Sequence, residues 1–107
     1  MTDAGGGMNC QWDAWYNLMP GADAEILHVV GEVEVPSSSI ALRLEPTNEG
    51  IVDDPTLIAL KLVVERPEAG DDMMAKKEVS WEDRAPGIKR VRIDGPCPDM
   101  VEVRDIH

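Results

Sequence analysis

The stretch TLIALKLVVER, residues 56–66, is the longest apolar run in the chain. Every second residue in it is aliphatic, and the positions between them are a mixture that includes Lys61 and Glu65. The aliphatic set is Ile58, Leu60, Leu62 and Val64. Because successive side chains of a β-strand point to opposite faces, this alternation predicts a strand with one face against a core.

Alternation of the same kind predicts more strands around this one. They are expected at residues 24–35, 40–45, 74–82, 88–93 and 100–106. Gly31, inside the first of them, indicates a bulge or a close backbone approach. The turn-rich connection at 46–55 is long enough to predict a crossover to an opposite sheet. Charged residues along 74–82 predict a strand at a sheet edge.

These elements predict an all-β fold of six strands, or seven if the N-terminal segment pairs with them. Strands do not alternate with helices, so we expect a two-layer antiparallel β-sandwich of immunoglobulin-like architecture, with a small barrel as the alternative. The label describes architecture only, because the Cys–Trp–Cys spacing of antibody domains is missing. The expected division is a flexible N-terminal arm at 1–23, which carries an aromatic cluster, and one sandwich domain at 24–107.

Composition and charge narrow the classes of partner. The chain has 107 residues, which is one domain. Its 21 acidic residues outnumber its 10 basic ones, for a formal net charge of −11. The negative electrostatic potential of such a chain repels phosphate backbones and anionic lipids, so we expect neither nucleic acid nor membrane as a partner. No signal peptide is evident, so the default compartment is the cytoplasm; a secreted or periplasmic location stays open if the chain is an excised mature domain.

The two cysteines are Cys10 and Cys97. In a reducing cytosol, free thiols are expected. The alternative is one disulfide that ties the N-terminal arm to the last hairpin. That bond would close a long loop and stabilise the fold by up to about 4 kcal/mol in the chain-entropy model.

Aromatic residues gather near the N-terminus, where Trp12, Trp15 and Tyr16 lie within five residues. Their i, i+3, i+4 spacing predicts a short helical turn. The cluster either caps an open end of the core, because a chain without Phe needs bulk there, or forms a partner-binding patch.

A second candidate binding surface is the mixed face of the 56–66 strand. Leu57 and Val63 on that face are too apolar for a freely solvated surface. If that strand neighbours the 24–35 strand, they would join Ile26 and Val30 in one apolar strip suited to a homodimer or a protein partner.

Acidic loops offer an alternative site. If the strands run antiparallel in chain order, Asp71, Asp72, Asp94 and Asp99 share one end of the fold, where their carboxylates could bind Ca²⁺. The ordinary interpretation is that these are solvated loop charges. His28 is expected to be the exposed cross-strand partner of a carboxylate rather than a metal ligand.

No catalytic arrangement is specified by the sequence. Serines 37–39 lie in a predicted turn without a nucleophile motif around them. We therefore expect a non-enzymatic module without a cofactor, which acts through contact with a protein partner or by homo-oligomerisation. The alternative is a module that binds a small ligand or Ca²⁺ through the acidic loops.

Overall fold

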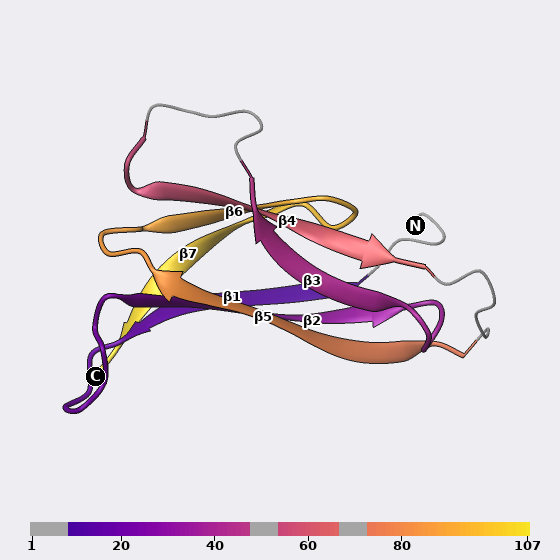
Figure 1. Ribbon diagram of the computed structural model, residues 1–107, viewed down its shortest axis with the longest axis horizontal. Helices are drawn as coiled ribbons and strands as arrows, with labels where there is room; N and C mark the ends of the chain where they lie inside the picture. The colour runs from indigo at the N-terminus through magenta and orange to yellow at the C-terminus, as the bar shows by residue number, and fades with distance from the viewer. Residues whose placement is uncertain (1–8, 48–53, 67–72) are drawn as a thin grey trace.

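The computed structural model describes residues 9–47, 54–66 and 73–107. Within these ranges the chain forms seven strands, and β4 coincides with the apolar run that the sequence singles out. The strands are β1 Cys10–Asn17, β2 Ile26–Val35, β3 Ala41–Pro46, β4 Leu57–Glu65, β5 Ala75–Arg84, β6 Arg90–Asp94 and β7 Asp99–Ile106. They lie in one sheet in the order β3-β4-β6-β7-β1-β2-β5 (Figure 1).

This arrangement corrects the expected immunoglobulin-like sandwich. The single mixed sheet curls until its two edge strands, β3 and β5, approach each other, so the fold is nearly a closed barrel rather than two layers. Two of the pairings, β1 with β7 and β4 with β6, are parallel, and the others are antiparallel. The sandwich prediction is wrong because alternation tells which face of a strand is buried but not which strand lies beside it.

The N-terminal segment also differs from expectation. The predicted helical turn at residues 12–16 is wrong, because these residues belong to β1, which lies between β2 and β7 inside the sheet. In β1 the residues Trp12, Ala14 and Tyr16 face the core, with period two. Strand β2 pairs with β1 along residues 10–16 and β7 pairs with it along residues 14–17, so the backbone of β1 gains partners that a single isolated helical turn cannot supply.

The core fills the inside of the curled sheet. Predicted inward residues of β4 are confirmed, with Leu60 fully buried and Leu62 2% exposed. The buried hydrophobic residues are Ala14, Tyr16, Leu27, Val29, Val33, Val35, Ile40, Leu44, Leu60, Leu62, Val79, Val91, Ile93 and Val101. Most of them are β-branched or Leu, which suits packing on pleated surfaces.

Gly31 marks a close approach rather than a bulge. The pairing of β2 with β1 and with β5 runs without interruption through this residue. Opposite it lies Trp12, and a Cβ atom built on Gly31 would come within 2.2 Å of the indole Cζ3. The indole therefore occupies the volume that any other residue at position 31 would need for its side chain.

Tyr16 ties β1 to the connection between β5 and β6. Its hydroxyl group donates a hydrogen bond to the carbonyl oxygen of Ala85 and accepts one of 2.9 Å from the amide of Ile88. The ring is buried in the core, so the hydroxyl satisfies polar backbone groups at the rim of the barrel.

Two further expectations concern the positions of strands in the sheet. The predicted crossover at 46–55 is wrong, because β3 and β4 are antiparallel neighbours in the same sheet. The prediction of an edge strand near 74–82 is confirmed, because β5 ends the strand order.

Cys10 and Cys97 form a disulfide between the start of β1 and the β6–β7 turn, so the expectation of free thiols is wrong and the alternative pairing is correct. The two residues are 87 positions apart in the sequence. The thiol prediction rested on an assumed compartment, whereas the sheet order places the two residues within reach of each other.

Candidate interaction surface

A row of four side chains crosses the outer face of β7, β1, β2 and β5. Strand register places Arg104 beside Trp15, Trp15 beside His28, and His28 beside Glu82. We call these four residues the aromatic row. The row follows from the period of two, because the residues that flank Trp15 and His28 in their own strands, such as Ala14 and Leu27, point into the core.

The centre of the row is a stacked pair. The rings of Trp15 and His28 are nearly parallel, at an interplanar angle of 13°, with their centroids 5.5 Å apart. His28 Nδ1 lies 3.1 Å from Glu82 Oε2, which confirms the expected cross-strand carboxylate partner. The side chain of His28 is 27% exposed, so the pair is accessible from solvent although it is packed on the sheet.

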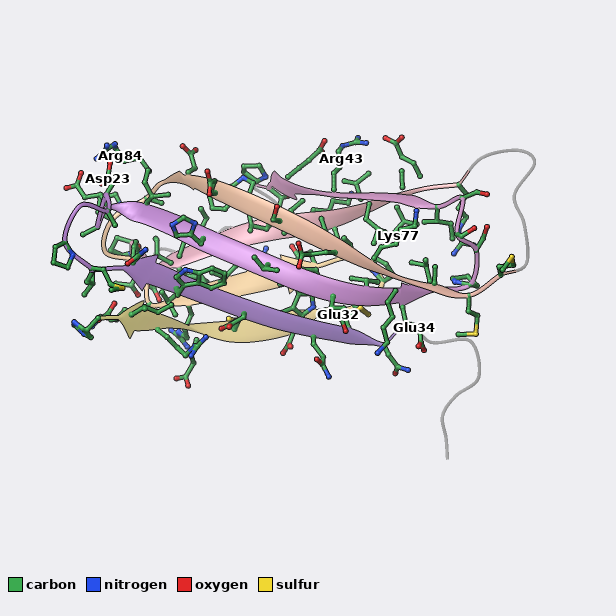
Figure 2. All side chains as sticks on the ribbon, turned by 90° about the horizontal axis from the view of Figure 1, so that it is seen from below. Asp23, Glu32, Glu34, Arg43, Lys77 and Arg84 are labelled. Carbon is green, nitrogen blue, oxygen red and sulfur yellow. A yellow bond between two sulfur atoms is a disulfide. The ribbon has the colours of Figure 1, made fainter. Side chains whose placement is uncertain are left out.

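Ion pairs surround the stacked pair. Arg104 donates from Nε to Asp13 Oδ1 over 3.1 Å, on the β7 side. At one end of β2, Arg84 contacts the carboxylates of Asp23 and Glu25. Figure 2 shows Asp23 and Arg84 together at that end, with Glu32 and Glu34 toward the other end of the strand. Exposed pairs of this kind add little stability, so their main effect is to give the face a polar rim.

An open hollow of about 470 Å³ adjoins the row at the same end. It is lined by Asn17, Ala22, Asp23, Ile26, His28, Glu82, Asp83 and Arg84. Ile26 and Val30 are half-buried on this outer face, beside His28 in β2. The face thus has an apolar and aromatic centre within a charged border, the composition typical of protein interfaces.

The predicted partner-binding residues are separated by the sheet. Trp15 lies in the aromatic row, whereas Trp12 and Tyr16 pack against or within the core. Leu57 and Val63 lie on β4, whose neighbours are β3 and β6. Because β4 and β2 are not neighbours, the expected continuous strip from Leu57 and Val63 to Ile26 and Val30 does not form.

The outer face of β4 is bordered by arginines. Register places Arg90 beside Leu57 and Arg43 beside Val63. The aliphatic stem of an arginine can cover apolar surface while its guanidinium group stays in water. Leu57 and Val63 are both half-buried, so this face exposes less apolar surface than its sequence indicates.

The alternative calcium group is only partly visible. Asp71 and Asp72 lie outside the described residues. Asp94 accepts two hydrogen bonds of 3.0 Å from Arg92, and Asp99 accepts one of 2.8 Å from the amide of Met100. Among residues 9–47, 54–66 and 73–107, no three His, Cys, Asp or Glu side chains are grouped as a metal site requires.

Comparisons with known proteins add no assignment. Neither the family models, nor the curated proteins, nor the solved structures gave a match to the chain. In the part of the chain that the structure describes, no helix is long and apolar enough to cross a membrane.

Sequence reasoning missed the stacked pair because it treated Trp15 and His28 as parts of separate segments. The signal was present in residues 10–17, where Gln11, Asp13 and Asn17 are polar and Trp15 alone breaks the alternation. Read with period two, that pattern places one tryptophan on the outer face.

Proposed function

We propose that this protein is a non-enzymatic interaction module that binds a protein partner through the outer face of β7, β1, β2 and β5. The observation that carries the proposal is the position of Trp15. This tryptophan stacks on His28 outside the barrel, although the core contains no Phe and could use its bulk.

The chemistry of the face supports a protein as partner. Tryptophan is enriched among the residues that dominate binding energy, because it buries a large rigid surface at low entropic cost. The border of ion pairs supplies orientation and specificity rather than affinity. The hollow beside the row offers a place for a side chain of the partner, next to His28 and Ile26.

The disulfide bears on where the module works. Disulfides persist in secreted, periplasmic and other oxidising environments and are rare in the cytosol. The Cys10–Cys97 bond is a modest argument for such a compartment in place of the cytoplasmic default.

Site-specific photo-crosslinking in the source cells tests the proposal. Ser80, exposed on the outer face of β5 beside Val30, is replaced by p-benzoylphenylalanine; Lys61, exposed on β4, is the control position. We expect discrete protein adducts from position 80 and fewer from position 61.

Matched variants identify the anchor. Trp15→Ala should abolish the adducts from position 80, whereas Leu57→Ala, a half-buried apolar residue on the other half of the sheet, should leave them unchanged. Circular dichroism confirms that both variants remain folded. Equal labelling from positions 80 and 61, or adducts that persist in folded Trp15→Ala protein, would contradict the proposal.

A further inference from the structure

The order of charges along the aromatic row is antisymmetric. From β7 to β5 it is a cation, two aromatic rings and an anion: Arg104, Trp15, His28 and Glu82. A surface with this order is complementary to itself when it is reversed. This self-complementarity identifies the partner of the face, so the inference rests on the proposed function.

We infer that the partner is a second copy of this chain, bound face to face about a two-fold axis that runs parallel to the strands between β1 and β2. Isologous contacts of this kind bring the same patch of both copies together. The axis reverses the row, so Arg104 meets Glu82 of the partner subunit, and Trp15 meets His28 of the partner subunit. Each contact occurs twice in the dimer.

Contacts within each copy extend the complementarity. Arg104 is already paired with Asp13, and Glu82 is already paired with His28. Association links these pairs into a network in which the charges alternate in sign along Asp13, Arg104 and Glu82 of the partner subunit. Opposite charges placed this way favour one register and disfavour others.

The adjacent row of outward residues also brings no like charges together in this dimer. Register places Asp13 beside Val30 and Val30 beside Ser80. The same axis sets Asp13 against Val30 of the partner subunit, so no like charges meet there. If the two-fold axis ran along the rows instead, Arg104 would face Arg104 of the partner subunit, and the two like charges would repel each other.

The net charge of −11 opposes association at long range. At about 0.15 M salt the screening length is about 8 Å, so repulsion between distant charges is largely removed while the contacts at the row remain. The dimer is therefore to be measured at this ionic strength.

Charge reversal tests the register. In sedimentation velocity, we expect Arg104→Glu and Glu82→Arg each to weaken self-association at least tenfold, because each variant opposes like charges twice. A 1:1 mixture of the two variants should form a heterodimer, since Glu at position 104 then meets Arg at position 82 and the second contact stays Arg104 with Glu82. The double variant should dimerise with itself.

The matched control uses the ion pair Arg43 with Glu65, on the other half of the sheet. Arg43→Glu and Glu65→Arg change the same charges and should leave the association constant unchanged. This control separates the register from the effect of net charge.

A wild-type chain that stays monomeric at about 1 mM, where even a Kd of 1 mM produces abundant dimer, overturns the inference. So does a mixture of folded Arg104→Glu and Glu82→Arg chains that associates no better than either alone. Adducts from position 80 to a different protein would then leave the proposed function in place, whereas the absence of all adducts removes both.

Discussion

At the scale of single residues, Gly31 and Trp12 are in close contact across two neighbouring strands. The indole lies on the glycine from the neighbouring strand, in the place of a side chain. Such cross-strand cover of a glycine by an aromatic ring compensates for the poor packing of glycine in a strand. The sequence predicts something unusual at Gly31 but not its cause, because the ring comes from a strand that sequence reasoning did not recognise.

Gly31→Ala is expected to destabilise the fold by about 1–3 kcal/mol, the usual cost of overpacking a core. The new methyl group would overlap the indole, so the ring or β1 must move. Urea denaturation measures the change. The control introduces Gly31→Ala into a Trp12→Leu protein, where the loss of stability should be smaller. An equal loss of stability with and without Trp12→Leu would show that the clash is not the cause.

At the scale of elements, strands β4 and β6 begin at a small network of hydrogen bonds. The carbonyl oxygen of Thr56 accepts hydrogen bonds from the amides of Lys89 and Arg90, over 2.8 and 3.2 Å. Asp54 holds Thr56 in place by accepting from its amide over 2.9 Å and from its hydroxyl group over 2.6 Å. These hydrogen bonds from Thr56, with the nearby Arg90 guanidinium, lower the pKa of Asp54 below its usual 3.8.

The lowered pKa of Asp54 predicts a pH dependence. A carboxylate whose pKa is lower in the folded state stabilises the protein above its unfolded pKa of 3.8 and loses that contribution as the pH falls through the folded value. Asp54→Asn should therefore be less stable than wild type at pH 7, and the difference should shrink at pH 3. Urea denaturation of both proteins at the two pH values measures it, and a difference that is independent of pH would refute the linkage.

Alternation in the sequence predicted most of the strands and their buried faces, because Val, Ile and Leu recur with period two where one face is covered. Leu60, Val91 and Ile93 are buried as expected. It failed at β1, where the same three aromatic residues also fit a helical spacing. Tertiary pairing with β2 and β7 decided between the two patterns, and no short-range signal reports that pairing.

The candidate site was predictable only in part. Trp15 and His28 were each singled out, but their stack depends on the register of two strands, which a single sequence does not give. The same holds for the strand order at the scale of the whole molecule, since parallel pairs join strands that are distant in the chain.

At the scale of the whole molecule, the Cys10–Cys97 bond closes a loop that contains most of the chain. In the chain-entropy model a loop of this size stabilises a protein by about 4–5 kcal/mol, and measured losses on removal of a native disulfide are about 2–5 kcal/mol. We expect the Cys10→Ala/Cys97→Ala variant to melt at a clearly lower temperature than the oxidised wild type. Scanning calorimetry with and without reductant measures this: reductant should lower the melting temperature of the wild type and leave the variant unchanged.

One strand joins the two halves of the sheet. Strand β7 pairs with β6 on one side and with β1 on the other, so it is the strand that joins β3, β4 and β6 to β1, β2 and β5 in the sheet. Among the seven strands that the structure describes, it is also the last in chain order. Before β7 joins the sheet, β1 and β6 each have an unpaired edge, and such edges invite pairing with other chains. We therefore expect chains that stop short of β7 to aggregate more readily than the full chain.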